Sequence, residues 1–450
     1  MKILRHILIA ASAALSLALL TRCGDPDIEI PAGDPTEDPG GTGNPGEPEK
    51  PVVNKEGSIP LLYINTGGKN IPKSDYIDAT MRLLNPDGVY SNQLDETFTI
   101  EIHGRGNSTW GMPKKPYKIK LAKKNRLLGM SDNKHWVLLA NYSDKSLLRN
   151  ALAFRLSEAA GMAWAVRWRP VEVYINGSYQ GVYQLAEHVR VGDERVELDV
   201  VGTSDNSGDA VTGGYFLWID GRSRDESNGV GFRTPRGLPV TIEDPEFPTT
   251  AQFNYIQSFI KQTELDLYNL SYANLSKIID IDSFIRYFFV QELGKNVDGN
   301  MRLSTYMWKP RNGKLGFPCV WDFDLAFGNC NYMHEVGATN GPDGWHIRNA
   351  IWFRQLFRQQ EFCDRVAAMW NEFYPKLAGV ETEMRQWAAR MDDAQKRNFQ
   401  RWTILNTHVW PNLVVKGSYQ GELNYMLDFF MTRAAWMNTE IQAGRLRKLD

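Results

Sequence analysis

The chain has 450 residues, of which 42% are hydrophobic and 12% aromatic, so it can bury a substantial core and more than one lobe. Its formal net charge is −2, which gives no argument from overall charge for binding nucleic acid, and we expect no nucleic-acid partner. Composition therefore indicates a globular protein whose activity must be inferred from local motifs.

Residues 1–22 are typical of an export signal. Two basic residues precede an apolar run over 7–20, which is too short to favour a membrane-spanning helix. The residues before Cys23 resemble the cleavage box of bacterial lipoproteins, in which the cysteine is lipidated and becomes the mature N-terminus, although Arg22 departs from the small residue usual there. This resemblance predicts an exported lipoprotein, attached through its lipid to the outer membrane or the cell surface. An ordinary secretory peptide that is cut elsewhere is the alternative.

Residues 23–57 follow as an acidic stretch rich in proline and glycine, which predicts a disordered tether. The acidic residues just after Cys23 resemble the export tag of surface lipoproteins in Bacteroidetes-like bacteria. Lysines gather farther along, between residues 114 and 134, so we expect the folded part to carry one basic surface.

Residues 58–220 are predicted to be rich in β-strands. Residues 116–121 alternate between polar and apolar, so in a strand Lys118 and Lys120 share one face. The other predicted strands are 60–64, 98–102, 171–175, 181–185 and 214–220, and the turn Asn176-Gly177 joins two of them into a hairpin. One helix is expected to begin near residue 143 or 144 and to end at Gly161, with Arg149 outside its apolar stripe.

Residues 221–450 are predicted to be mainly helical. The expected helices are 251–267, 281–295, 351–376, 381–406 and 423–446, and only 303–308 and 315–324 have the pattern of strands. The sequence therefore predicts an α+β protein with a sheet-rich N-terminal lobe over 58–220 and a helical C-terminal lobe over 221–450. A ligand is expected in the cleft between the two lobes.

Three cysteines follow Cys23 in the chain. An oxidising compartment would allow a disulfide between Cys319 and Cys330, and free buried thiols are the alternative for these two residues and for Cys363. We find no zinc-type spacing of cysteine and histidine, so the sequence predicts no structural zinc site.

A basic region could bind phosphate groups. The sequence Gly104-Arg105-Gly106 has glycines that permit a close approach of the backbone and an arginine that can bind phosphate oxygens in a fork. The alternative is a glycine-bearing hairpin turn with a solvated arginine. Lys118 and Lys120, on one face of the next strand, favour the phosphate site, with one lysine as the nucleotide contact.

Two acidic motifs could hold a cation and activate a hydroxyl. Asp298-Gly299-Asn300 follows an apolar helix, and a carboxylate there could orient a hydroxyl, unless this is an ordinary Asp-Gly turn. Asp322 and Asp324 would lie on the same side of a strand, where a divalent cation relieves their repulsion; the alternative is an acidic pair bonded to backbone amides. Oxygen ligands favour Mg²⁺ or Mn²⁺ over zinc.

The sequence resembles the spore coat protein H (CotH) kinase family. The similar blocks occur in the family's order over nearly all of the mature chain, at residues 105–110, 113–121, 141–146, 148–150, 173–177, 181–183, Glu187 and 321–324. The resemblance implies an atypical, reduced protein-kinase-like fold that uses ATP and a divalent metal to phosphorylate protein serines. The chain lacks the glycine-loop, His-Arg-Asp and Asp-Phe-Gly spellings of ordinary protein kinases.

The resemblance also assigns roles to individual residues. Asp298 matches the catalytic aspartate, Asp322 matches the metal-binding aspartate, and the strand around Lys118 matches the nucleotide phosphate contacts. We infer Asn300 and Asp324 as further metal ligands. The sequence thus predicts transfer of the ATP γ-phosphoryl group to a serine or threonine of a protein substrate.

The sequence is also compatible with two other functional hypotheses. A lipid-anchored protein outside the inner membrane meets little ATP, so the chain could instead be a non-catalytic, surface-tethered binding or assembly lipoprotein that keeps the kinase-like fold. Such a protein would contact glycans or envelope proteins through exposed aromatic side chains. A metal-dependent hydrolase built on the same aspartates is the third reading, but it does not explain the basic strand.

Overall fold

The computed structural model describes residues 59–85, 88, 90–221, 230–269 and 271–447. The predicted signal peptide, the tether and the lipidation site at Cys23 lie outside the described residues. Strands predominate before residue 250 and helices after it, so the predicted α+β class is confirmed. Among the described helices, none combines the length and apolar character needed to span a bilayer.

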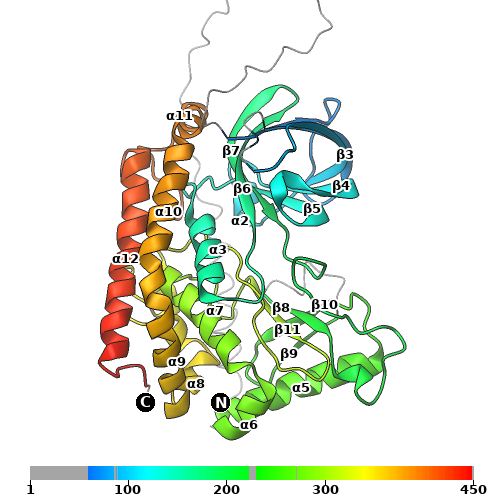
Figure 1. Ribbon diagram of the computed structural model, residues 1–450, viewed down its shortest axis with the longest axis vertical. Helices are drawn as coiled ribbons and strands as arrows, with labels where there is room; N and C mark the ends of the chain where they lie inside the picture. Colours follow the sequence, from blue (N-terminus) through cyan, green and yellow to red (C-terminus); the bar gives the residue numbers. More distant parts are fainter. Residues whose placement is uncertain (1–58, 86–87, 89, 222–229, 270, 448–450) are drawn as a thin grey trace, which may run out of the picture. The chain divides into compact units, whose positions relative to one another are not determined.

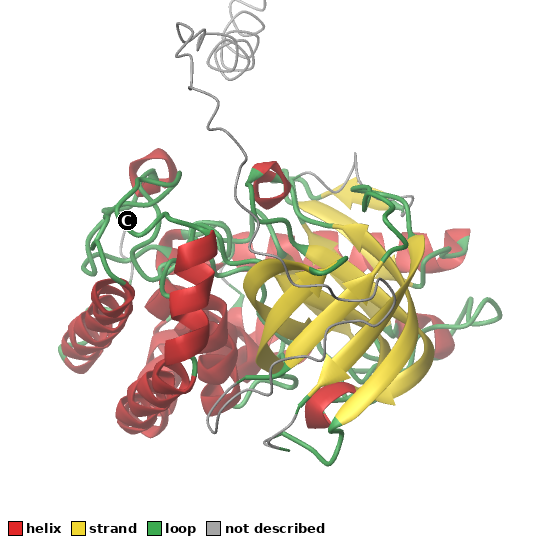
Figure 2. Cartoon of the chain, turned by 90° about the horizontal axis from the view of Figure 1, so that it is seen from above, coloured by secondary structure: helices red, strands yellow, loops and turns green. Residues whose placement is uncertain are grey.

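The N-terminal half forms a closed β-barrel, drawn in yellow in Figure 2. Its strands follow the order β1-β2-β3-β4-β5-β7-β6, and β1 closes the barrel by pairing in parallel with β6. The bounds are β1 Leu61–Asn65, β2 Ile77–Leu84, β3 Asp95–Gly104, β4 Tyr117–Arg126, β5 Asp132–Leu139, β6 Trp168–Ile175 and β7 Ser178–Glu187. The predicted hairpin is the pair β6–β7, whose turn residues Asn176 and Gly177 have the positive φ values that such a turn requires.

Alternation along the strands fills the barrel with apolar side chains. In β4, Tyr117, Ile119 and Leu121 are buried, whereas Lys118 and Lys120 are only partly buried, as the alternation predicts. Trp136 of β5 is fully buried in the same apolar cluster, and its indole nitrogen donates a hydrogen bond to the Asn133 carbonyl at 3.1 Å. Because nearly every interior group is apolar, burial of these side chains stabilises the barrel.

A second, antiparallel sheet has the strand order β11-β8-β10-β9. Its strands are β8 Tyr215–Ile219, β9 Gly231–Arg233, β10 Pro239–Asp244 and β11 Thr305–Lys309. Residues 221–450 were predicted to be mainly helical, so this sheet adds β9 and β10 to the strands expected there. Strand β11 is the predicted strand 303–308, shortened at its start.

Most of the described α-helices lie in the C-terminal half of the chain, and two lie in the N-terminal half. Their bounds are α2 Ser108–Gly111, α3 Arg149–Ala160, α5 Thr250–Tyr268, α6 Tyr272–Ile278, α7 Ile281–Gly294, α8 Phe353–Leu356, α9 Gln360–Phe373, α10 Leu377–Arg390, α11 Asp392–Arg401 and α12 Tyr419–Gln442. Helix α5 begins at a capping box formed by Thr249 and Gln252, and α12 begins where Ser418 accepts a hydrogen bond from the Gly421 amide. Helices α9, α10 and α12 pack together, as Figure 1 shows.

Helix α3 begins later than the sequence predicts. The Asp144 carboxylate accepts hydrogen bonds from the amides of Ser146 at 3.1 Å and of Arg149 at 2.8 Å, so it holds residues 144–148 in a turn. Arg149 is fully buried and forms an ion pair with Asp144 at 2.6 Å. The expectation that Arg149 lies apart from the packed face was therefore wrong, because the arginine has a buried charged partner.

The predicted strand over 315–324 is also wrong. Only Leu315 and Gly316 make isolated β-bridges, and the chain then continues without regular structure. Asp322 has φ of +68°, which is incompatible with a strand. The structure has buried free thiols at Cys319, Cys330 and Cys363. The possible disulfide between Cys319 and Cys330 is therefore not formed in this structure.

Helix α11 is attached to the barrel by several side-chain hydrogen bonds, most of which involve Arg397 and Asn398. Arg397 donates to both carboxylate oxygens of Glu172 on β6, at 2.8 and 2.6 Å. The Asn398 side-chain oxygen accepts hydrogen bonds from the buried Lys114 ammonium at 2.9 Å and from the Val182 amide at 3.0 Å. Burial holds the pKa of Lys114 well below its usual range, and its ammonium donates to the Val182 carbonyl on β7 as well as to Asn398 on α11.

Candidate active site

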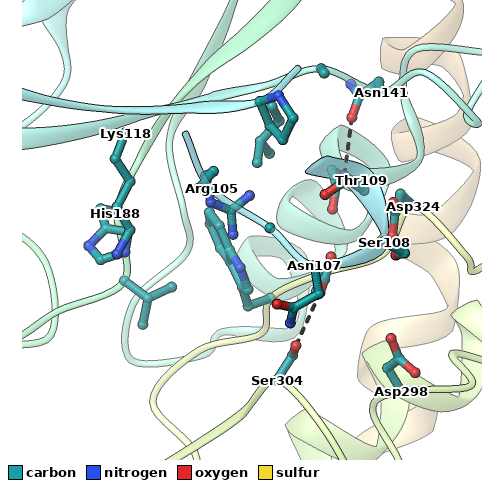
Figure 3. A pocket seen from close by; sticks show the side chains of 18 of the residues that line it. Arg105, Asn107, Ser108, Thr109, Lys118, Asn141, His188, Asp298, Ser304 and Asp324 are labelled. Carbon is teal, nitrogen blue, oxygen red and sulfur yellow. Dashed lines mark hydrogen bonds between the residues drawn. The ribbon is translucent and has the colours of Figure 1, made fainter. Parts of the chain in front are cut away.

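A cavity of about 600 Å³ gathers the charged residues that the sequence singled out. Its walls include Arg105, Lys118, Asp298, Asp322 and Asp324, which come from the end of β3, from β4 and from two irregular segments that flank β11. Figure 3 shows Arg105 and Lys118 on one side of this space, and Asp298 and Asp324 on the other. The fold therefore brings cations and carboxylates from distant parts of the chain to one cavity.

Arg105 is held by a tight loop after β3. A side chain at Gly104 would collide with the Trp110 ring at 2.1 Å, and Gly106 has φ of +82°, so both positions favour glycine. The Arg105 guanidinium lies 5.6 Å from the centre of the Trp321 ring, a cation–π contact. Its Nε is buried and has no hydrogen-bond partner among the described residues, so this donor is available to an anion in the cavity.

The lysines named by the sequence have different surroundings. Lys118 lines the cavity, opposite His103 on β3 and Val137 on β5. Lys120 does not line it, because its ammonium is paired with Glu101 at 2.6 Å on the neighbouring strand. Of these two lysines, therefore, only Lys118 is placed to contact a ligand in the cavity.

Asp298 lies in a tight turn after α7. The Asn296 side chain accepts a hydrogen bond from the Asp298 amide at 3.3 Å, and the Tyr287 hydroxyl donates to the Gly299 carbonyl at 2.8 Å. A side chain at Gly299 would collide with Gln291 at 1.8 Å, so the Asp-Gly turn depends on its glycine. Asn300, predicted as a metal ligand, is not among the residues that line the cavity, and its Oδ1 is buried without a partner in the described part of the chain.

Asp322 is fixed in a strained conformation by contacts from three other segments. Its carbonyl accepts a hydrogen bond from the Asn296 side chain at 3.0 Å, and Asn150 of α3 accepts one from the following amide, of Phe323, at 2.8 Å. The Ser304 hydroxyl donates to the Asp322 carboxylate at 3.1 Å. A left-handed backbone at a residue other than glycine costs about 1 kcal/mol or more, and such strain is concentrated at functional sites.

Asp324 is the most electrostatically perturbed carboxyl group of the cavity. Its pKa is raised well above the ordinary value because the surrounding protein desolvates it and because Asp322 and Asp298 repel its charge. The Arg105 guanidinium opposes this rise only in part. Three carboxyl groups thus share one negative region, and a bound cation would relieve their repulsion.

The carboxylates do not form a closed protein cage for a metal. Within the residues that the structure describes, no group of three or more His, Cys, Asp and Glu side chains is arranged to hold a metal ion. Mg²⁺ is usually held by one or two carboxylates, with water and substrate phosphates completing its ligands. Asp322 and Asp324 fit that incomplete type of site, since both are oxygen donors that face the same cavity.

Sequence reasoning missed the polar residues that hold the aspartates in place. Ser304, Asn296 and Asn150 each contact Asp322 or its neighbour, and none was assigned a role. Only Asn296 had a local signal, because an asparagine two positions before an aspartate can form an Asx-turn. The contacts of Ser304 and Asn150 join segments far apart in the chain and could not be read from spacing.

A second hollow of about 330 Å³ is lined by Asn331, Tyr332, His334, Glu335 and Trp410. The rings of Tyr332 and Trp410 are nearly parallel, with an interplanar angle of 7°, and Trp410 is 52% exposed. The pKa of Tyr332 is raised above the ordinary value by burial and then by the charge of Asp298, and the Tyr332 ring packs against an apolar cluster that includes Val297, the residue before Asp298.

The family model described as CotH kinase protein matches residues 102–437, which is more than half of the chain and includes every charged residue of the cavity discussed above. No curated protein matches the chain.

Proposed function

The chain belongs to the CotH kinase family, and from that premise we propose that it transfers the γ-phosphoryl group of ATP to serine or threonine hydroxyls of a protein. One observation carries this proposal: Arg105, Lys118, Asp298, Asp322 and Asp324 line a single cavity. Cations suit the phosphates and carboxylates suit a divalent metal and a hydroxyl, so the cavity has the two kinds of charge that phosphoryl transfer needs. We further propose that barrel and helices correspond to the two lobes of a reduced kinase-like fold.

Asp298 is the proposed base. Its carboxylate orients the acceptor hydroxyl and takes its proton while the hydroxyl oxygen forms a bond to the γ-phosphorus. The bond between that phosphorus and the bridging β–γ oxygen breaks, and ADP leaves with the electron pair. Arg105 and Lys118 stabilise the negative charge on the phosphate oxygens.

Asp322 and Asp324 are the proposed ligands of Mg²⁺ or Mn²⁺, and we leave Asn300 out of this set because it does not line the cavity. When bound, the cation would neutralise charge on the phosphates and on the two carboxylates. The strained backbone at Asp322 and its contacts with Ser304, Asn296 and Asn150 hold one carboxylate in a fixed place before any ligand arrives.

The protein acceptor is proposed to approach from the side of the second hollow. Tyr332 packs against the cluster that contains Val297, next to the proposed base Asp298, and the neighbouring Trp410 offers a flat exposed face for the polypeptide that flanks the acceptor hydroxyl. Replacing Trp410 with alanine should therefore raise the KM for a protein acceptor and leave the KM for ATP unchanged.

The decisive experiment measures transfer of radiolabelled phosphate from ATP to a panel of serine-rich proteins. We expect Asp298→Asn to lower the rate by about 10²- to 10⁴-fold, the usual contribution of a general base. Asp193→Asn is the matched control, because the Asp193 side chain is 94% exposed and does not line the cavity. Equal rates for the wild type and Asp298→Asn would refute the proposal.

Nucleotide binding separates the kinase from the non-catalytic alternative. Thermal stabilisation by ATP with Mg²⁺ that is lost in Asp322→Asn supports the enzyme, whereas stabilisation by polysaccharide alone supports a binding protein.

Export and lipidation also remain proposals of ours. Cys23 would carry the lipid, and a Cys23→Ser variant should lose incorporation of labelled palmitate and leave the membrane fraction. If the variant stays in the membrane fraction, the anchor is not at Cys23.

A further inference from the structure

Ser304 is the one described residue whose side chain is seen to donate a hydrogen bond to the Asp322 carboxylate. Its Oγ lies 3.1 Å from Asp322 Oδ2. Ser304 is 8% exposed, so little water competes for its hydroxyl. The bond uses one carboxylate oxygen and leaves the other, Oδ1, for a ligand in the cavity.

The position of Ser304 is set by the second sheet. Thr305, the next residue, begins β11 and pairs with Ile219 of β8. The residue after Ile219 is Asp220, whose carboxylate is fully buried and accepts a hydrogen bond from the Ser304 amide at 3.2 Å. Two hydrogen bonds therefore run in series, from the end of β8 through Ser304 to the Asp322 carboxylate.

The backbone of Ser304 also adopts an uncommon conformation. Its φ is +49°, in the left-handed region that residues other than glycine and asparagine rarely adopt. Asp322 has φ of +68°, so both partners of this hydrogen bond are held in uncommon conformations. Strained backbone at both partners of a hydrogen bond indicates that the surrounding structure holds them in place, and such strain is typical of functional sites.

From this geometry we propose that Ser304 is a positioning residue that aims the Asp322 carboxylate at a divalent cation, and that Asp220 holds Ser304 in place for that task. The inference rests on the proposed function, in which Asp322 is a metal ligand. Hydrogen bonds to ligating carboxylates restrict their orientation, and the loss of such an outer partner typically lowers metal affinity by about 10- to 100-fold.

The test measures Mn²⁺ binding to the purified protein directly, by electron paramagnetic resonance of the free ion, with no substrate turnover. Ser304→Gly removes the hydroxyl and tolerates the left-handed backbone, whereas Ser304→Ala removes the hydroxyl and keeps the strain. We expect Mn²⁺ affinity to fall about tenfold in both variants. Thermal stability should be maintained or raised in Ser304→Gly, which separates the hydroxyl's role from a structural one.

Two further variants complete the design. Asn312→Gly is the control, because Asn312 also has a positive φ, of +51°, but lies outside the cavity lining, and it should leave Mn²⁺ affinity unchanged. Asp220→Asn keeps an oxygen that can accept the Ser304 amide, so its effect should be smaller than that of Ser304→Gly.

The results distinguish this inference from the function on which it rests. If Asp322→Asn abolishes Mn²⁺ binding but Ser304→Gly stays within about twofold of the wild type, the positioning role of Ser304 is overturned and the metal site stands. If Asp322→Asn itself binds Mn²⁺ like the wild type, the proposed metal site is wrong, and the inference fails with it.

Discussion

The barrel and the segment 295–329 differ in backbone regularity and in the interactions that stabilise them. The barrel strands are regular, and their interior is almost wholly apolar. Segment 295–329 contains one short strand, β11, and is otherwise irregular. Its non-glycine residues with positive φ are Lys295, Met301, Ser304, Asn312, Asp322 and Phe327, whereas no non-glycine residue within the seven described barrel strands has a positive φ.

This difference indicates where stability and function reside. Burial of apolar surface stabilises the barrel. The segment bears the candidate catalytic groups, and side-chain hydrogen bonds, including one from Arg149 to the Ala326 carbonyl, hold it in conformations that it would not adopt alone. Loss of a barrel side chain should therefore reduce the free energy of unfolding. Loss of a side chain that holds segment 295–329 by hydrogen bonds should reduce activity as well.

The largest effect on stability is expected from the barrel interior. Trp136→Ala should lower the free energy of unfolding by about 3–5 kcal/mol, because it removes a fully buried indole and leaves a cavity. Denaturant unfolding measures this change. Trp410→Ala is the control, since Trp410 is 52% exposed and its loss should stay within about 0.5 kcal/mol. Similar losses for the two variants would contradict the role given to the barrel interior.

A somewhat smaller effect is expected beneath the segment. Arg149→Met leaves Asp144 buried without its ion-pair partner and removes the hydrogen bond from Arg149 Nε to the Ala326 carbonyl at 3.0 Å. We expect a loss of about 3 kcal/mol, at the low end for a broken buried pair, because Asp144 keeps its bonds to Ser146. Unfolding measurements give the loss, and phosphate transfer at a temperature where the variant is folded should also fall.

An arginine on the same helix provides the comparison for that variant. Arg155 pairs with Glu383 at 2.6 Å on a partly exposed surface. Arg155→Met should cost less than about 1 kcal/mol and leave transfer unchanged. If Arg149→Met loses stability but retains full transfer rate, the pair supports the fold without supporting the site.

The smallest effect is expected on the outside of the barrel. Arg82 and Asp95 pair at 2.6 Å across β2 and β3, but both side chains are more than 40% exposed. Arg82→Gln should reduce the free energy of unfolding by less than about 1 kcal/mol, and the difference should shrink further in high salt. A loss above about 2 kcal/mol would show that the barrel depends on its surface charges as well as on its interior.

The sequence was informative wherever local pattern decides structure. Alternation placed Tyr117, Ile119 and Leu121 inside the barrel, and the Asn176-Gly177 turn located the β6–β7 hairpin. Helices α5 and α7 occur within a few residues of their predicted bounds. The charged residues of the cavity were named in advance, Arg105 and Asp324 from local pattern and the other three also from the family resemblance, and Arg105, Lys118, Asp298, Asp322 and Asp324 do line one cavity.

The sequence failed where distant contacts decide. Helix α3 was extended too far because the Asp144 turn is fixed by a buried ion pair. Residues 315–324 were predicted as a strand, but side chains from three other segments hold Asp322 in a left-handed conformation. Lys120 was grouped with Lys118 because both lie on one face, and only the register between β3 and β4 brings Glu101 to its ammonium.

The tie between Lys114 and Asn398 bears on how the protein is made. A ribosome releases the barrel sequence long before residue 398 is synthesised, so during that interval the Lys114 ammonium lacks its side-chain acceptor on α11. We therefore expect the barrel of the nascent chain to be incompletely folded, and sensitive to proteases, until α11 has been synthesised. Limited proteolysis of ribosome-bound chains, some long enough to expose α11 outside the exit tunnel and some too short, tests this order, and equal resistance of the two would show that the barrel matures alone.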